Sequence, residues 1–163
     1  PQLLDILKQY GVKATFFMVA ENAERSPELL ARVRDEGHVV GNHTYHHMRG
    51  CKHDTQAYVR DALCGAEVLQ TTLFRPPHGR MRNNQKKALI DQGYTIYLWD
   101  VLTHDYNPHY SVDKMLAVVK RYTRNGSILV MHDSLKSKDR MLEALPQIIE
   151  WLQSNGYKTG VLG

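Results

Sequence analysis

Short apolar segments alternate with amphipathic helical segments along almost the whole chain, and this alternation limits the folds it can adopt. Apolar residues recur at helical spacing within residues 3–10, 27–36, 58–69, 84–92, 111–122 and 141–152. Each helical segment is followed by a short apolar run that is predicted to be a strand, at residues 14–19, 39–40, 73–75, 95–99, 128–131 and 158–162. Helices between consecutive strands are typical of parallel sheets with both faces covered. The sequence therefore predicts an α/β fold with six parallel strands.

The two ends of this pattern sharpen the prediction. A closed barrel built from such units needs a strand before the first helix, because two inner strands otherwise keep unpaired edges. The chain begins with Pro1 in the first helical turn, where proline is favoured. We therefore expect a distorted, incomplete (β/α) barrel whose first strand is missing from residues 1–163. Near the other end, Pro146 is predicted to break or restart the last helix.

The composition is that of one globular domain. The chain has 163 residues, of which 42% are hydrophobic and 23% charged, so it can form a core without disulfides or structural metals. We expect a single domain over residues 1–163. The formal net charge is +4, but Lys and Arg are mostly interleaved with Asp and Glu, which disfavours nucleic acid as a partner. No apolar stretch approaches the roughly 20 residues of a membrane span, and the oligomeric state is not readable.

Two histidines four positions apart follow the predicted strand at residues 39–40. If His43 and His47 share a helical turn, their Cβ atoms lie about 5–6 Å apart, so both imidazoles can bind one metal ion. His46 should then point elsewhere. Exposed loop histidines explain the pair alone equally well, but its position after a strand favours metal, because parallel barrels carry their chemistry in such loops. Zinc is the expected ion, with nickel or cobalt as alternatives.

A proline-rich turn follows the predicted strand at residues 73–75. It reads Arg75-Pro76-Pro77-His78-Gly79, and its two prolines restrict the backbone. Arg75 is expected to hold a carboxylate by a charge-assisted hydrogen bond. The backbone amide of His78 is expected to stabilise a tetrahedral oxyanion. Considered alone, the segment is better explained as a structural turn with a solvent-facing arginine.

The predicted strand at residues 128–131 runs directly into His132. An imidazole at this position can act as general acid toward a leaving amine. Asp105, in the loop after residues 95–99, could orient that imidazole and favour its charged form. In isolation, a buried histidine at the end of a core strand is the more common arrangement.

In combination, these segments resemble the polysaccharide deacetylases of carbohydrate esterase family 4, the NodB-homology domain. Four motifs occur in the family's order: Ala14-Thr15-Phe16-Phe17 looks like the A-T-F-F strand, His43-Thr44 with His47 matches H-[ST]-x-x-H, Arg75 to Gly79 matches R-P-P-x-G, and Leu129 with His132 matches L-x-x-H. Asp105-Tyr106 is similar to the family's Asp-Trp segment. The resemblance covers essentially the whole chain and implies a seven-stranded NodB-type barrel.

The resemblance implies hydrolysis of N-acetyl groups on an amino-sugar glycan, peptidoglycan or chitin-like, with release of acetate in an envelope or extracellular setting. It also implies a set of site residues of three kinds. These are the ligands of a divalent metal, His43 and His47; the catalytic residues His132, Asp105, Arg75 and His78; and the substrate-lining residues Leu129, Tyr106 and Pro77. In this scheme Arg75 orients the base, and Asp105 is the partner of the general acid His132.

Three departures from the family keep other functions open. The family's T-F-D-D motif, which carries the base aspartate and the third metal ligand, belongs on a strand before Pro1 and is absent from residues 1–163. Leu102 stands where the family often has aspartate, and His78 stands where it has tyrosine. An esterase acting on O-acetyl groups of xylan is one alternative. A catalytically dead glycan-binding domain that lacks the base aspartate is the other.

Overall fold

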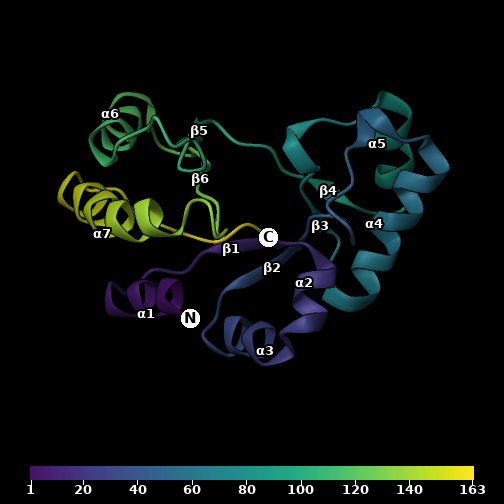
Figure 1. The fold of residues 1–163 in the computed structure, drawn as a ribbon, viewed down its shortest axis with the longest axis horizontal. Coiled ribbons are helices and arrows are strands. Elements are labelled where there is room, and N and C mark those ends of the chain that lie inside the picture. Colours follow the sequence, from purple (N-terminus) through teal and green to yellow (C-terminus); the bar gives the residue numbers. More distant parts are fainter. The chain divides into compact units, whose positions relative to one another are not determined.

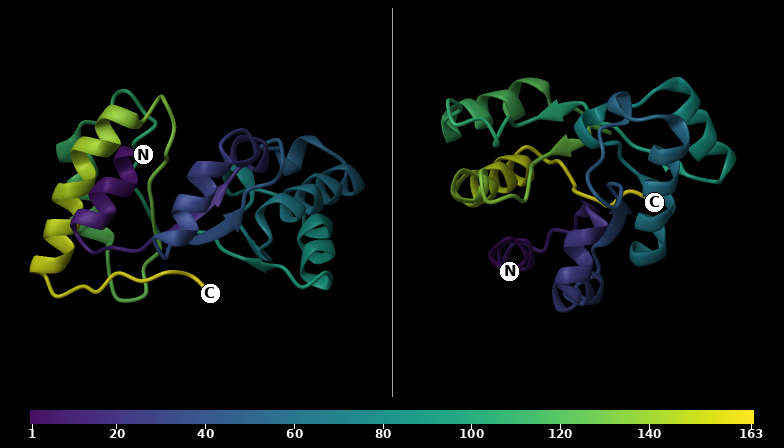
Figure 2. Two further views of the ribbon diagram at one scale, coloured as in Figure 1. Left: turned by 90° about the horizontal axis from the view of Figure 1, so that it is seen from below. Right: turned by 45° about the vertical axis from the view of Figure 1, so that its right-hand side comes forward.

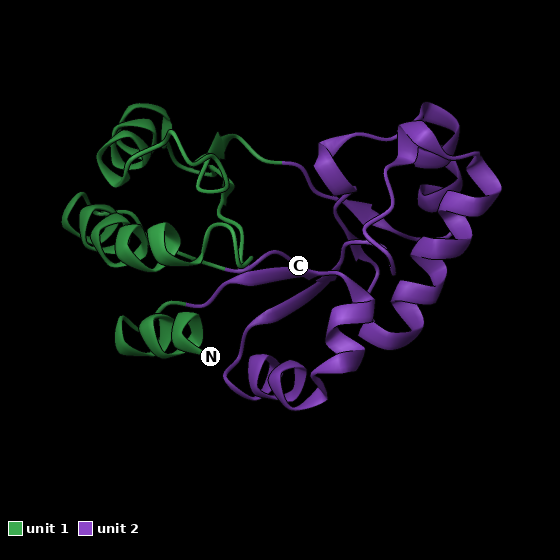
Figure 3. Cartoon of the chain, viewed as in Figure 1, with its two compact units in different colours: residues 1–12, 99–160 green, residues 13–98, 161–163 purple.

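The computed structural model describes all residues from 1 to 163 (Figure 1). The chain forms two compact units (Figure 3). Unit 1 comprises Pro1–Val12 and Trp99–Gly160, and unit 2 comprises Lys13–Leu98 and Val161–Gly163. None of the helices combines the length with the apolar character that crossing a bilayer requires. The prediction of one domain over residues 1–163 stays a prediction.

Unit 2 contains a four-stranded parallel sheet in the order β1-β2-β3-β4. Its strands are β1 (Thr15–Met18), β2 (Val39–Asn42), β3 (Leu73–Phe74) and β4 (Thr95–Ile96). In β2, a Cβ atom at Gly41 would lie 2.5 Å from the ring of Phe17, so only glycine fits beneath that ring. Since the strands are parallel, their carboxyl ends lie at one edge of the sheet. The loops that leave this edge carry the histidine and arginine motifs.

Helices of unit 2 cover the sheet and supply most of its apolar core. They are α2 (Ala20–Arg25), α3 (Pro27–Asp35), α4 (Thr55–Leu69) and α5 (Asn83–Asp91), with short 3₁₀ turns η1 (Gly50–Lys52) and η2 (Pro77–Gly79). The longest of them, α4, contacts both α2 and α5 (Figure 1). It begins at a capped end, since the Asp54 carboxylate accepts a hydrogen bond from the Ala57 amide at 2.9 Å. Tyr58, Phe74 and Leu89 form the centre of this core.

Unit 1 contains a two-stranded parallel sheet, β5 (Val101–Leu102) with β6 (Leu129–Val130), and three helices. The helices are α1 (Gln2–Gln9), α6 (Val112–Tyr122) and α7 (Lys138–Ser154). Helix α1 lies against α7 (Figure 2). The apolar stripes of α6 and α7 meet over β5, and Met115, Val119 and Ile148 are almost completely buried there. The strand β5 thereby gains the cover that a parallel strand needs.

The structure confirms the predicted α/β fold and its incomplete barrel architecture, because its parallel strands form sheets of four and two and no closed barrel. Two predictions about individual elements were wrong, the strand at residues 158–162 and the helix break at Pro146. Residues 158–162 are not a strand, since the Leu162 amide donates to the Thr15 side-chain hydroxyl instead of joining a backbone ladder. The structure still has six strands, because β5, which was not predicted, takes the place of the predicted strand at residues 158–162 in the count. Helix α7 continues through Pro146, because buried residues on both sides of the proline hold it in place.

Candidate functional site

The loop after β2 brings two imidazole rings together. The ring centroids of His43 and His47 lie 5.0 Å apart. The loop is not helical, however, because Thr44 has φ 65° and His47 has φ 57°, both in the left-handed region. The predicted cause of the proximity, a shared helical turn, is therefore wrong. Two left-handed residues bend the backbone sharply, and this bend brings the rings to the same place.

Hydrogen bonds fix the first of these rings. Nδ1 of His43 donates to the carbonyl oxygen of Arg75 at 2.6 Å. A neutral imidazole that donates through Nδ1 keeps its Nε2 lone pair for a ligand, the arrangement found in most histidine metal sites. The His43 amide also donates to the Met18 carbonyl at 2.9 Å. The orientation of His43 is thus set by the neighbouring strand and by the turn after β3.

The buried Asn42 and Thr44 fix the loop after β2 through side-chain hydrogen bonds. Both residues are completely buried. Oδ1 of Asn42 accepts from the Thr44 amide at 2.8 Å, while its Nδ2 donates to the Ala62 carbonyl at 2.7 Å. The Thr44 hydroxyl accepts from the Met48 amide at 2.9 Å. Asn42 was not singled out in the sequence, although a polar residue ending an apolar strand was a usable signal.

His46 points away from the other two histidines, as predicted. Its Nδ1 donates to the Asp61 carboxylate on α4 at 2.5 Å. The second carboxylate oxygen of Asp61 accepts from the amides of Tyr45 and His46, each at 3.1 Å. Asp61 is buried, and its carboxylate connects Tyr45 and His46, in the middle of the histidine loop (residues 43–47), to α4. No sequence signal points to Asp61, because nothing local relates residue 61 to residue 46.

The histidine loop fits part of a metal site. The Nδ1 hydrogen bond fixes the ring of His43, and the ring of His47 lies beside it, so the chain supplies two imidazole rings of the kind zinc prefers. No group of three or more His, Cys, Asp or Glu side chains in residues 1–163 is placed to hold a metal ion. The candidate donors within residues 1–163 are therefore the imidazoles of His43 and His47.

The turn after β3 holds a buried arginine. The guanidinium of Arg75 donates to the carbonyl oxygens of Tyr97 at 3.4 Å and Leu98 at 3.1 Å, and it lies 4.1 Å from the centre of the Phe17 ring. Burial lowers the pKa of Arg75 to about 10, which still leaves it charged at neutral pH. The alternative of a solvent-facing arginine is wrong, because Arg75 is only 9% exposed.

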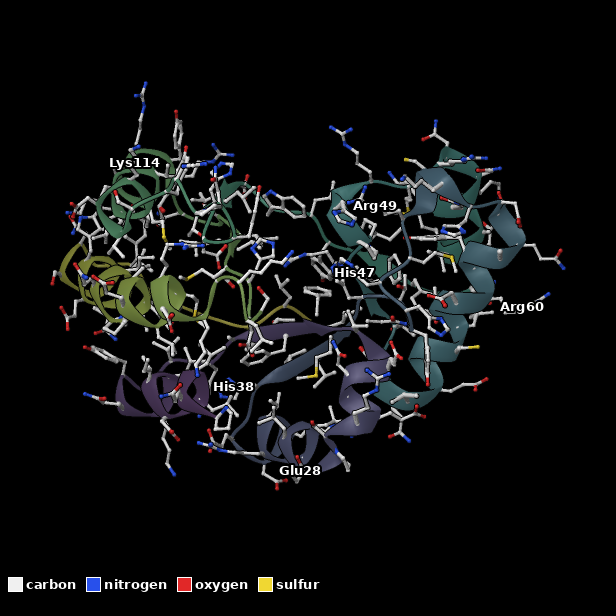
Figure 4. The ribbon with its side chains drawn as sticks, in the orientation of Figure 1. Glu28, His38, His47, Arg49, Arg60 and Lys114 are labelled. Carbon is white, nitrogen blue, oxygen red and sulfur yellow. The ribbon has the colours of Figure 1, made fainter.

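His78 occupies an unusual backbone position in the same turn. It has φ 58° and ψ 14°, and it follows the buried Pro77. The His78 ring lies 4.9 Å from that of His47, and its Nε2 accepts a hydrogen bond from Nε of Arg49 at 2.9 Å. Burial, and then the charge of Arg49, lower the pKa of the His78 imidazole. Figure 4 shows Arg49 beside His47 on the same loop; the sequence offered no signal for its role.

A second group of predicted residues lies in unit 1. His132 follows β6, and its Nδ1 donates to the Asp105 carboxylate at 2.8 Å. The other carboxylate oxygen accepts from the His132 amide at 2.5 Å. Asp105 is completely buried, whereas 40% of the His132 side chain is exposed. The pair therefore presents the far side of the imidazole to solvent while the carboxylate stays protected.

Further contacts position this pair. Arg140 on α7 donates through Nε and Nη2 to the Asp105 carbonyl, at 3.1 and 2.9 Å. The Tyr106 ring stands perpendicular to the His132 ring at 5.1 Å. Leu129 in β6 is partly buried against the unit 1 core. Arg140 was missed in the sequence because its partner lies 35 positions earlier.

The predicted site residues thus form two groups, one in each unit. Unit 2 carries His43, His47, Arg75, Pro77 and His78, and unit 1 carries Asp105, Tyr106, Leu129 and His132. Each group contains a histidine whose Nδ1 donates to a fixed oxygen, the Arg75 carbonyl in one and the Asp105 carboxylate in the other.

Comparison with known proteins identifies a protein family whose model matches this chain. The model of the polysaccharide deacetylase family matches residues 1–97. A peptidoglycan-N-acetylglucosamine deacetylase of Bacillus cereus is 35% identical over 163 residues, which cover 96% of this chain and 59% of that protein. The chain therefore spans about three fifths of the length of this relative.

Solved structures give the same result. The Bc1960 peptidoglycan N-acetylglucosamine deacetylase superposes with a TM-score of 0.94 at 34% identity, covering 99% of this chain and 78% of that one. A mutant of BA3943, described as a CE4 family pseudoenzyme, has a TM-score of 0.89 at 27% identity, covering 99% of this chain and 60% of that one. Similar folds therefore occur in a deacetylase and in a pseudoenzyme.

Proposed function

This chain belongs to the polysaccharide deacetylase family, carbohydrate esterase family 4, and on that premise we propose that the protein removes N-acetyl groups from an amino-sugar glycan and releases acetate. Peptidoglycan is the proposed glycan, because relatives that are 35% and 32% identical to this chain are named peptidoglycan-N-acetylglucosamine deacetylases. The observation that carries the proposal is the paired imidazoles of His43 and His47, with Nδ1 of His43 held by a carbonyl oxygen.

Family membership implies a divalent metal cofactor, and we propose zinc, held in part by His43 and His47. Imidazole nitrogen is a preferred zinc ligand. A divalent metal supplies Lewis-acid chemistry, polarising a carbonyl and lowering the pKa of water. The hydrogen bond from His43 to the Arg75 carbonyl supports this role, because it keeps one tautomer and one ring orientation.

In unit 2, Arg75 and His78 are proposed to stabilise negative charge during the reaction. Arg75 keeps its positive charge although it is buried, and such a cation can orient the carboxylate that serves as base. The amide of His78 is the proposed donor to the oxyanion. Pro77 is buried immediately before it, which supports a fixed amide direction. We assign Pro77 to the lining of the substrate site.

In unit 1, His132 is the proposed general acid. Hydrolysis of the amide joins a water oxygen to the acetyl carbon, breaks the C–N bond and requires a proton on the departing nitrogen. An imidazolium at His132 can deliver that proton from Nε2, because Asp105 accepts from Nδ1 and holds the ring in one orientation. Tyr106 and Leu129, the former packed on the His132 ring, are the proposed lining for the sugar and the acetyl methyl.

Acetate release by the full-length protein tests the proposal. We expect release from peptidoglycan fragments, its loss in EDTA, and its recovery when zinc is added back. His43→Asn and His132→Asn should each lower kcat/KM by at least about 100-fold. His109→Asn is the matched control, because this histidine is exposed and its ring has no partner among residues 1–163. It should leave the rate unchanged.

Two results would contradict the proposal. Glycan binding without acetate release by the intact, zinc-loaded protein would identify a non-catalytic glycan-binding protein. Acetate release from acetylated xylan but not from N-acetylated sugars would identify an esterase. Either result separates the proposed deacetylase from its alternatives without reference to the fold.

A further inference from the structure

A cavity of about 320 Å³ borders the turn after β3. Its wall is mainly apolar and includes Pro76, Met81, Ile96 and Leu98. Two cationic residues, Arg80 and Lys86, also line it. A cavity with apolar walls and a few charged groups is typical of a site for a small ligand or for one group of a larger ligand.

The two cations have no counter-charge. Neither the Arg80 nor the Lys86 side chain has an ion pair or hydrogen bond within residues 1–163. The segments around them, residues 46–53 and 75–90, contain no Asp or Glu. Lys87, the next residue on α5, differs because it pairs with Asp91 at 2.6 Å. Two uncompensated positive charges beside an apolar wall favour an anionic ligand.

The wall of the cavity is held rigidly. Nε2 of the completely buried Gln85 donates to the Gly50 carbonyl at 2.9 Å, and its Oε1 accepts from the Arg82 amide at 2.8 Å. Arg82 donates to the Cys51 carbonyl at 3.0 Å. A Cβ atom at Gly50 would lie 2.7 Å from the Gln85 side chain, so the two segments pack as closely as they can. A rigid wall loses little entropy when a ligand binds.

The cavity shares its turn with the candidate active site. Pro76 and Gly79 line it, and His78 lies between them in the sequence. The His78 ring lies 4.9 Å from the His47 ring, with the two planes tilted by 55°, so a glycan whose acetyl group reaches the histidines would place a neighbouring substituent at this cavity. This step rests on the proposed function, because it takes the histidine loop as the place of reaction.

We propose that the cavity is a subsite for a carboxylate of the substrate and that the protein therefore prefers peptidoglycan to uncharged chitin-like glycans. The N-acetylmuramic acid residue of peptidoglycan carries a lactyl group with one methyl group and one carboxyl group, and the latter is a free carboxylate where no stem peptide is attached to it. The methyl group would lie on the apolar wall near Ile96, and the carboxylate would pair with Arg80 and Lys86. A carboxylate of the stem peptide offers the same chemistry, and chitin offers none.

The test compares substrates that differ in this carboxylate. Acetate release is measured on a peptide-free N-acetylglucosamine–N-acetylmuramic acid oligosaccharide, on the same compound with its lactyl carboxylate converted to an amide, on a fragment with its stem peptide, and on chitotetraose. We expect the double variant Arg80→Gln/Lys86→Gln to raise KM for the carboxylate substrates by about tenfold, equivalent to about 1.4 kcal/mol. The rate on chitotetraose and on the amide should stay unchanged.

Lys87→Gln is the matched control for the change at Lys86, because it removes one positive charge from the same helix outside the cavity. An effect confined to the peptide-bearing fragment would assign the carboxylate to the stem peptide, and an effect on the peptide-free oligosaccharide would assign it to the lactyl group. Equal losses on all substrates, or no loss on any, would overturn the subsite.

A binding experiment distinguishes a failure of the subsite from a failure of the proposed function. Calorimetric titration of the same compounds into the protein needs no turnover. If acetate is never released but the carboxylate compounds still bind about tenfold more tightly than the amide, and the double variant removes the difference, the subsite stands and the deacetylase fails. If chitotetraose and muramyl substrates are hydrolysed alike, the deacetylase stands and the subsite fails.

Discussion

Some residues of this chain adopt a backbone conformation or a protonation state that is unfavourable by itself, and contacts with the surrounding structure stabilise it. Thr44 is the clearest case, because a β-branched residue at φ 65° is rare and strained. It is held there by Asn42, whose side chain accepts from its amide, and by its own hydroxyl, which accepts from Met48. Strain of this kind is characteristic of functional loops, and here it turns His43 and His47 toward one another.

At the residue scale, His38 should make stability depend on pH. The residue is 5% exposed, and its Nδ1 accepts from the Ala14 amide at 3.1 Å. Its buried Nε2 makes no hydrogen bond and lies 3.9 Å from a carboxylate oxygen of Glu36. Burial, together with Lys13, lowers the pKa of the imidazole; Glu36 opposes this effect and Arg32 adds to it. The unfolded chain therefore takes up the proton first as the pH falls below about 6.5.

The contribution of neutral His38 to the free energy of unfolding should therefore be fully present above about pH 6.5. It should decrease as the pH falls toward the lower pKa of the folded state, by at most about 1.4 kcal/mol per pH unit for this one proton. His38→Asn keeps an acceptor for Ala14 but cannot ionise. Urea unfolding at pH 7.5 and 5.5 should show a smaller loss of stability in the variant than in the parent protein. Equal losses in the two proteins would show that His38 does not contribute.

At the scale of elements, the contact between α4 and the histidine loop has no room for an added methyl group. A Cβ atom at Gly65 would lie 2.7 Å from Oδ1 of Asn42 and 3.2 Å from the backbone of Thr44 and Tyr45. Alanine is intrinsically the better helix former, by about 1 kcal/mol. Packing and propensity therefore predict opposite effects for Gly65→Ala.

We expect packing to dominate, so Gly65→Ala should lower the free energy of unfolding by about 1–3 kcal/mol and should weaken zinc binding, since Asn42 and Thr44 position the loop. Cys64→Ala, at an exposed position on the same helix, is the control and should change little. Urea unfolding and zinc titration measure the two effects. A more stable Gly65→Ala protein would show that the loop is free to move away.

At the scale of the whole molecule, metal binding should be coupled to folding. A ligand that binds only the folded state raises the unfolding free energy, by about 2.7 kcal/mol when its concentration is 100 times its Kd. Because the left-handed loop that pairs His43 with His47 exists only in the fold, zinc should raise the unfolding midpoint and EDTA should reverse this shift. In His43→Asn the shift should be much smaller; a shift of undiminished size would place the metal elsewhere.

Some properties of this protein follow from its sequence alone. The alternation of helical and apolar segments predicts parallel α/β structure, because the period of apolar residues is a local consequence of which face is buried. The order of four motifs identifies the family before any contact is known. Short elements are the exceptions: α2 and β5 are too brief to show a period, and 158–162 has a strand-like composition without a strand partner.

Only the tertiary structure decided how the candidate site is held together. No local signal predicts a left-handed threonine, and the partners of His46 and Asp105 lie 15 and 35 positions away in the chain, on Asp61 and Arg140. The same is true of the cavity lined by Arg80 and Lys86. Periodicity depends on neighbours in the chain, whereas the pairing of a buried polar group depends on which distant atoms the fold brings within hydrogen-bonding distance.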